Sequence, residues 1–216
     1  MVLEVDNIEL NFDTKKILNS IYIKAEKGKI TGILGRNGSG KSCLLEIIFG
    51  SLKPKYKTIR INSKTLTKKG YAINKIAYLP QHALLPKKLK LSTAFKLYDL
   101  KWEDFISYFE HFKLYKNAKT NQLSSGELRV VETYLSICAK KEIILLDEPF
   151  SFIAPIYVNT FKKILVKEKA NKLILITDHF YNDIISLSDT LYLITNRVSK
   201  LVSSKQDLVA EGYLKR

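Results

Sequence analysis

A glycine-rich loop at residues 35–42 constrains the fold of this chain more than any other feature. Its residues fit the pattern G-x-x-x-x-G-K-[ST] at every defined position. They are Gly35, Arg36, Asn37, Gly38, Ser39, Gly40, Lys41 and Ser42. An apolar run over 30–34 precedes the loop, and an apolar helical pattern over 42–49 follows it. This strand–loop–helix order is the setting that a phosphate-binding loop requires, so the motif predicts a nucleotide-binding α/β fold.

The chemistry of the loop follows from its residue types. Glycines let the backbone curve around an anion with its N–H groups pointing inward, and the N-terminus of the following helix adds partial positive charge. Lys41 is expected to reach the β- and γ-phosphates, and the Ser42 hydroxyl is expected to ligate Mg²⁺. Cys43 is grouped with the loop as a nucleotide-binding residue, although we expect its thiol to pack rather than to react.

An apolar run that ends in two acids supplies the partner motif. Residues 143–146 are Ile, Ile, Leu and Leu, and Asp147 and Glu148 follow them directly. At the end of a buried strand, Asp147 is expected to hold Mg²⁺, directly or through water. Glu148 is expected to polarise an attacking water as a general base. The simpler alternative is an acidic pair that starts a helix after a strand, and the phosphate loop argues against it.

The remaining pattern predicts a mostly parallel sheet with an antiparallel β region before it. Residues 2–34 alternate apolar and polar positions with a turn near 13–16, and further short strands are expected at 58–62 and 76–79. The all-apolar runs 143–146 and 173–176 are typical of strands buried on both faces. Helical patterns at 155–168 and 180–187 alternate with them. Strands at 190–195 and 198–202 and a short helix complete the chain.

An aromatic-rich stretch separates the two halves of this pattern. Between 91 and 118, large apolar residues recur at spacings of three and four, which predicts a helical stripe. We interpret its aromatic rings as core packing rather than as a ligand-binding box. A second helix is expected over 125–140.

The charge is the one unusual feature of the composition. Lys and Arg number 36 against 21 Asp and Glu, so the net charge is +15, and nearly all of the excess is lysine scattered along the chain. Such a surface attracts anions, but the lysine excess is equally consistent with an ordinary solvated surface, and we expect no nucleic-acid partner.

No apolar run is long enough to span a bilayer, and the first residues do not resemble a signal peptide. Two cysteines make no disulfide framework, so a cytoplasmic protein with reduced thiols is expected.

Three further segments make the chain similar to the ABC-type ATPases over essentially its whole length. Leu123-Ser124-Ser125-Gly126-Glu127 resembles the signature sequence of that family. Gln81 resembles the Q-loop glutamine, and His179 resembles the switch histidine. Phe12 stands where an aromatic residue stacks on adenine.

The resemblance implies a fold, a set of roles and a set of partners. The expected fold is an α/β P-loop NTPase in one domain, with a catalytic core and antiparallel β subdomain over 1–90 and 140–216 and a helical subdomain over 91–139. ATP and Mg²⁺ are the implied cofactors. Gln81 would sense Mg²⁺ and the attacking water, and His179 would bind the γ-phosphate. A second anion site would be formed by Ser124, Ser125, Gly126 and Glu127.

That second site is expected to lie far from Lys41 of the same chain. The resemblance therefore implies a head-to-tail pair with a second ATPase subunit, identical or different, in which each ATP lies between one phosphate loop and the other signature helix. It also implies separate membrane permease subunits and a peripheral position on the inner face of the membrane. The helical segment between Gln81 and Leu123 is short for the family.

Three residues depart from the family pattern. Ser125 replaces the first glycine of the commonest signature, and Glu127 replaces its glutamine. Ala154 stands where an aspartate of the D-loop usually couples the two ATP sites, which concerns turnover rather than nucleotide binding. Two alternatives therefore stay open beside a transporter subunit: an ABC-type ATPase that acts on ribosomes or DNA, and a nucleotide-binding partner with weak hydrolysis.

Overall fold

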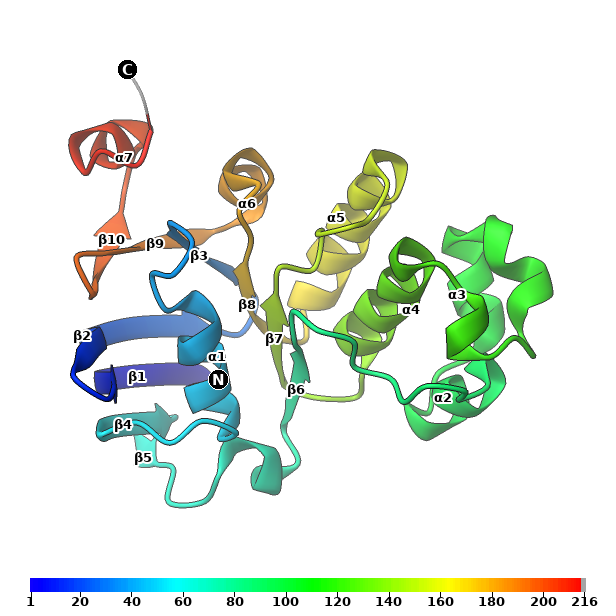
Figure 1. The fold of residues 1–216 in the computed structure, drawn as a ribbon, viewed down its shortest axis with the longest axis horizontal. Helices are drawn as coiled ribbons and strands as arrows, with labels where there is room; N and C mark the ends of the chain where they lie inside the picture. Colours follow the sequence, from blue (N-terminus) through cyan, green and yellow to red (C-terminus); the bar gives the residue numbers. More distant parts are fainter. Residues whose placement is uncertain (215–216) are drawn as a thin grey trace.

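Two β-sheets carry the fold (Figure 1). The computed structural model describes residues 1–214. The smaller sheet is antiparallel and has the strand order β2-β1-β4-β5. Its strands are β1 (Val2–Phe12), β2 (Lys15–Glu26), β4 (Tyr56–Ile61) and β5 (Lys64–Thr65). Alternate residues of β1 and β2 are buried, as the period-two pattern predicted, and Asp13 enters the turn between them with φ +50°.

The larger sheet is the six-stranded core, with the order β10-β9-β3-β8-β7-β6. All neighbours are parallel except β9 and β10. The strands are β3 (Ile30–Gly35), β6 (Ile76–Leu79), β7 (Ile143–Asp147), β8 (Leu173–Thr177), β9 (Thr190–Thr195) and β10 (Val198–Val202). Every residue of β3, β7 and β8 is buried, so the all-apolar runs are central strands and the predicted α/β class is confirmed.

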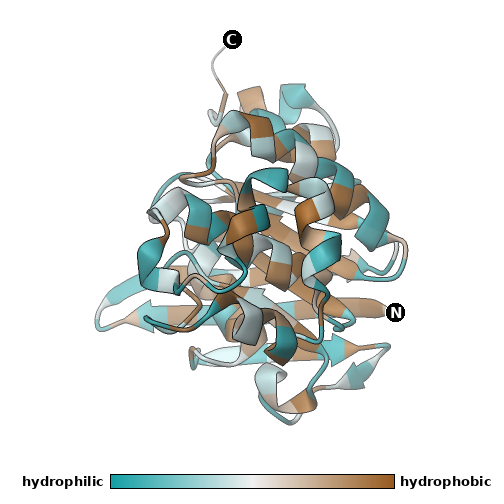
Figure 2. Ribbon diagram, turned by 90° about the vertical axis from the view of Figure 1, so that its right-hand side faces the viewer, coloured by the Kyte–Doolittle hydropathy of each residue, from teal (hydrophilic) through white to brown (hydrophobic). Residues whose placement is uncertain are grey.

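Helices cover both faces of the parallel sheet. The helix α1 (Lys41–Phe49) packs in one apolar core with the antiparallel sheet and one face of the parallel sheet. The other face packs in a second core with α4 (Ser125–Cys138), α5 (Pro155–Lys169) and α6 (Tyr181–Leu187). Figure 2 shows hydrophobic residues along the interior strands and hydrophilic residues at the outer hairpins. The last helix is α7 (Lys205–Ala210).

The aromatic-rich stretch is helical but not continuous. It forms α2 (Leu91–Leu97), α3 (Trp102–Tyr108) and the 3-10 helix η2 (Glu110–Tyr115), which lie beyond α4 from the sheet (Figure 1). Further 3-10 helices are η1 (Gly70–Ile73) and η3 (Thr120–Gln122). Phe95 packs on Trp102 with ring centroids 4.9 Å apart, and Phe105 lies 5.1 Å from Phe95. The interpretation of these rings as core packing is therefore confirmed.

The cysteines and the lengths of the helices complete the description of the fold. Cys43 and Cys138 are free thiols. Among residues 1–214, no helix is both long and apolar enough to cross a membrane.

Candidate functional site

The phosphate loop leaves the end of β3 and enters α1. Gly38 and Gly40 have φ values of +79° and +96°, a conformation that glycine adopts without strain. The side chain of Lys41 is almost fully buried, and its Nζ donates hydrogen bonds to the carbonyl oxygens of Gly35 (2.8 Å) and Arg36 (3.4 Å). Burial lowers the pKa of Lys41, while the carboxylates of Glu148 and other nearby acids act in the opposite direction.

A cavity of about 610 Å³ opens over this loop. It brings together residues from the first hairpin, the phosphate loop, the segment after β6, and the ends of β7 and β8. Its lining consists of Phe12, Lys15, Ile17, Asn37, Gly38, Gly40, Lys41, Ser42, Cys43, Gln81, Glu148 and His179. The fold explains this meeting, because the carboxyl ends of the parallel strands β3, β6, β7 and β8 lie at one edge of the sheet.

Three side chains converge on one oxygen of Glu148. Gln81 Nε2 donates a hydrogen bond to Glu148 Oε2 at 2.8 Å, and the Ser151 hydroxyl donates to the same oxygen at 3.2 Å. His179 Nδ1 lies 3.5 Å from it. Glu148 itself has φ +48°, an uncommon backbone conformation for a residue with a side chain. The carboxylate is thus held in one orientation at the mouth of the cavity, as a proton acceptor must be.

Asp147 lies deeper than Glu148. It is 1% exposed and does not line the cavity. The Thr177 hydroxyl donates to Asp147 Oδ1 at 2.7 Å, and the Tyr78 hydroxyl lies 3.5 Å from Oδ2. Ser42, Gln81 and Asp147 each carry a side-chain oxygen, the type of donor that Mg²⁺ prefers, but of the three only Ser42 and Gln81 line the cavity.

Buried Asp178 holds the two turns that carry Glu148 and His179. Its Oδ2 accepts a hydrogen bond from the Phe150 backbone N–H (3.2 Å), and its Oδ1 accepts one from the Phe180 N–H (3.0 Å). Burial raises the pKa of Asp178, and these two N–H groups act in the opposite direction. Sequence reasoning missed this role, because the partners are backbone groups.

Arg129 is a second residue that sequence reasoning missed. It lies on α4, is 5% exposed, and its guanidinium donates to three carbonyl oxygens, those of Pro80 (2.7 Å), Asp147 (2.7 Å) and Glu148 (2.8 Å). One side chain therefore ties the segment before Gln81 to the end of β7. A lone arginine within the apolar pattern of the helix was the only signal in the sequence.

The signature segment forms the start of α4. Ser124 is the N-cap residue: its hydroxyl accepts from the Glu127 N–H (3.2 Å), and Glu127 Oε2 accepts from the Ser124 N–H (2.8 Å). These hydrogen bonds lower the pKa of Glu127 and give its carboxylate a capping role. Among Ser124, Ser125, Gly126 and Glu127, none lines the cavity over Lys41.

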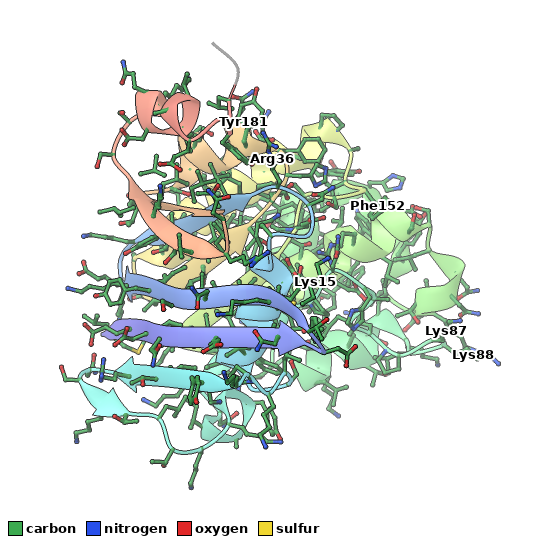
Figure 3. The ribbon with its side chains drawn as sticks, turned by 60° about the vertical axis from the view of Figure 1, so that its left-hand side comes forward. Lys15, Arg36, Lys87, Lys88, Phe152 and Tyr181 are labelled. Atoms are coloured by element: carbon green, nitrogen blue, oxygen red, sulfur yellow. The ribbon has the colours of Figure 1, made fainter. Side chains whose placement is uncertain are left out.

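Gly126 lies against the turn that follows β7. A Cβ atom at this position would come 2.7 Å from the carbonyl oxygen of Phe152, whose side chain projects from the surface (Figure 3). We expect Gly126→Ala to lower the free energy of unfolding by about 1–3 kcal/mol, because backbone cannot yield easily. Urea denaturation measures this change. Exposed Ser125→Ala is the control, with an expected change below about 0.5 kcal/mol, and equal stability of both variants would contradict the contact.

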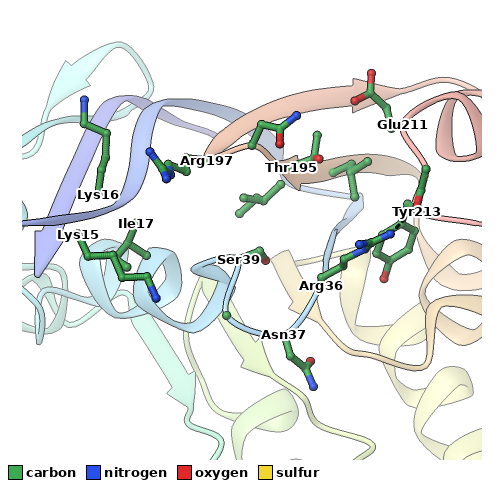
Figure 4. Close-up of a pocket in the computed structure, with 15 residues that line it drawn as sticks. Lys15, Lys16, Ile17, Arg36, Asn37, Ser39, Thr195, Arg197, Glu211 and Tyr213 are labelled. Carbon is green, nitrogen blue, oxygen red and sulfur yellow. Dashed lines mark hydrogen bonds between the residues drawn. The ribbon is translucent and has the colours of Figure 1, made fainter.

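Gly35, Arg36 and Ser39 of the phosphate loop, and Ala154, lie outside the lining of the cavity over Lys41. Arg36 Nη2 donates to the Gly212 carbonyl at 2.8 Å, and its side chain lines a neighbouring second cavity of about 430 Å³ (Figure 4). Ser39 also lines that second cavity. Ala154 is the exposed N-cap residue of α5 and makes no side-chain capping hydrogen bond.

The arrangement matches a family of known proteins. The model of the ABC transporter family matches residues 18–151, more than half of the chain. An uncharacterised ABC transporter ATP-binding protein of Methanocaldococcus jannaschii is 34% identical over 163 residues. That match covers 69% of this chain and 64% of the relative, so the chain spans just under two thirds of its length.

A lipopolysaccharide export system ATP-binding protein of Haemophilus influenzae is 27% identical over 209 residues, which cover 89% of this chain and 86% of that protein. Among solved structures, one described as the ATP-binding subunit of an ABC transporter superposes with a TM-score of 0.83. It is 19% identical, covers all of this chain and is itself covered to 95%. This likeness supports the fold.

Proposed function

The chain belongs to the ABC transporter family, and from this membership we propose that it binds and hydrolyses ATP to drive transport through separate membrane subunits. The observation that carries the proposal is the cavity in which Lys41 and Ser42 of the phosphate loop face Glu148, Gln81 and His179. A phosphate-binding loop beside an oriented carboxylate is the combination that phosphoryl transfer to water requires.

In this proposal the phosphate loop holds the nucleotide. Backbone N–H groups of Gly38 and Gly40 face the phosphates, and the Lys41 ammonium exchanges its carbonyl partners for the β- and γ-phosphates. Ser42, Gln81 and Asp147 would hold Mg²⁺. The ion would neutralise part of the charge of the phosphates.

Glu148 then serves as the general base. It accepts a proton from the attacking water, and Gln81 and Ser151 keep its carboxylate oriented through their hydrogen bonds to Oε2. His179, whose Nδ1 lies 3.5 Å from the same oxygen, would bind the γ-phosphate. The buried Asp178 fixes both turns, so these groups keep their spacing during the reaction.

The signature segment supports a paired arrangement. Ser124–Glu127 caps a helix outside the cavity, so we propose that it meets the γ-phosphate bound by a second ATPase subunit packed head to tail. Two such sites would close when ATP binds and open after hydrolysis.

In the same proposal, residues 91–139 form the helical subdomain, and the rest of the chain forms the catalytic core and antiparallel β subdomain.

Recovery from native membranes tests the transporter part of the proposal. We expect the chain, carrying an affinity tag, to co-purify with a membrane permease from detergent extracts, and to be found on the inner face of the membrane. Recovery only with ribosomes or DNA at physiological salt would instead support the alternative of a factor that acts on them.

Phe12 tests the position of the adenine ring. It is 48% exposed at the end of β1 and lines the cavity. We expect Phe12→Ala to weaken ATP binding by roughly tenfold, because a lost aromatic stack costs on the order of 1 kcal/mol in addition to buried area. Fluorescence titration with a nucleotide analogue measures the affinity. Tyr22→Ala removes a similarly exposed ring elsewhere on the first hairpin and serves as the control, and equal affinities for both variants would contradict the stack.

A further inference from the structure

A second buried side chain of α4, Glu132, contacts the segment that carries Gln81. Glu132 is 2% exposed, and its Oε1 accepts hydrogen bonds from the backbone N–H groups of Leu84 and Leu85, both at 2.8 Å. Within the described residues 1–214, no lysine, arginine or histidine forms an ion pair with it. One carboxylate oxygen of Glu132 therefore accepts from two consecutive backbone N–H groups of this loop.

Arg129 lies one turn before Glu132 on the same face of the helix. Its guanidinium holds the Pro80 carbonyl, and Glu132 holds the N–H groups of Leu84 and Leu85. The two side chains thus fix both ends of the short segment that contains Gln81. A buried hydrogen bond to a charged group is stronger than one between neutral groups, so these anchors resist displacement.

From this arrangement we propose that Glu132 is a positioning residue for hydrolysis: it holds the loop in the register that lets Gln81 donate to Glu148. Because Glu132 belongs to the helix that begins with the signature segment, it links that helix to the loop that carries Gln81. The inference rests on the proposed hydrolysis of ATP, and Glu132 itself touches neither the nucleotide nor the attacking water.

A role in positioning predicts a different kinetic signature from a role in folding. In the proposed function the direct contacts to the nucleotide come from the phosphate loop and Phe12, and among residues 1–214 no hydrogen bond joins these residues to Glu132. Loss of the anchor should therefore lower kcat and leave the affinity for nucleotide unchanged. A displacement of about 1 Å in a catalytic group can reduce the rate by on the order of 100-fold.

The test compares three variants of the full chain with Mg-ATP. Glu132→Leu fills the same space without an acceptor, and we expect kcat to fall by roughly 10- to 100-fold while KM and ADP affinity stay within about twofold. Glu132→Gln keeps an oxygen for both N–H groups and is expected to restore kcat to within about threefold of the wild type. Ser136→Ala, one turn further on, removes a buried hydroxyl and is the matched control with unchanged kinetics.

Hydrogen exchange supplies the second readout. In Glu132→Leu, faster exchange should be confined to the peptide over 81–90, with α4 and β7 still protected. Unchanged kcat in Glu132→Leu would overturn the inference, and so would a loss of ADP binding, which would make Glu132 a general structural residue. Failure of the wild type to hydrolyse ATP would instead overturn the proposed function, so the two failures are distinguishable.

Discussion

Replacing Lys41 with alanine is expected to weaken ATP binding by about 100-fold, close to 3 kcal/mol, because charge-assisted hydrogen bonds to two phosphates are lost. The ammonium lies inside the loop, with Nζ 2.8 Å from the Gly35 carbonyl, and bound phosphates would replace this carbonyl as its partners. Isothermal titration calorimetry with ADP and ATP measures the change.

Two measurements show whether the loss of ATP affinity in Lys41→Ala is specific: the stability of the variant without nucleotide, and the affinity of a control variant. Burial lowers the pKa of Lys41, which means that the folded environment disfavours the charge, so the free energy of unfolding without nucleotide is not expected to fall by more than about 1 kcal/mol. Lys15→Ala removes an exposed lysine from the same cavity and should weaken binding by less than about fivefold. Equal affinity of the wild type and Lys41→Ala would contradict the assignment of the phosphate loop.

Replacing Glu148 with glutamine is expected to reduce ATP turnover by roughly 10²- to 10⁴-fold, the contribution of a positioned general base. Glutamine has the same shape but does not accept the proton of the attacking water. Nucleotide affinity should stay within about threefold, because the phosphate contacts belong to the loop of Lys41. Since binding without hydrolysis leaves the closed state occupied, ATP-dependent pairs of subunits should accumulate and be visible by analytical ultracentrifugation.

A glutamate at the other end of the same strand provides the matched control. Glu142 precedes β7, is exposed and pairs with Lys75 at 2.7 Å. Glu142→Gln should leave turnover and affinity unchanged, since exposed ion pairs contribute little. A wild-type rate that is itself at background would support the alternative of a nucleotide-binding partner, to which the replacement of the usual D-loop aspartate by Ala154 already points.

The sequence was sufficient for those parts of the fold where burial alone decides the structure. The all-apolar runs of β3, β7 and β8 could be placed because strands buried on both faces admit few polar residues. The stretch over 91–118 was harder to place. Its spacing of three and four is shared by α-helices and successive short helical turns, and the break after α2 depends on Asp99, whose φ is +53°.

The residues of the candidate site likewise fall into those that sequence motifs predict and those that only the folded chain reveals. Lys41, Gln81, Glu148 and His179 belong to ordered motifs, and the topology of a parallel sheet brings such motifs to one edge. Arg129, Glu132 and Asp178 could not be assigned, because each binds backbone N–H or carbonyl groups, which leave no pattern in the sequence. Only the folded chain shows which backbone groups approach each buried charge.

Phosphate release by the purified wild type and by Glu148→Gln, measured side by side with saturating Mg-ATP, tests the central claim most directly. That claim is that the chain cleaves ATP with Glu148 as the base. The account predicts a rate that saturates with ATP in the wild type and lies at least about 100-fold above that of the variant. Equal rates in the two proteins, whether both at background or both at the wild-type value, would contradict it.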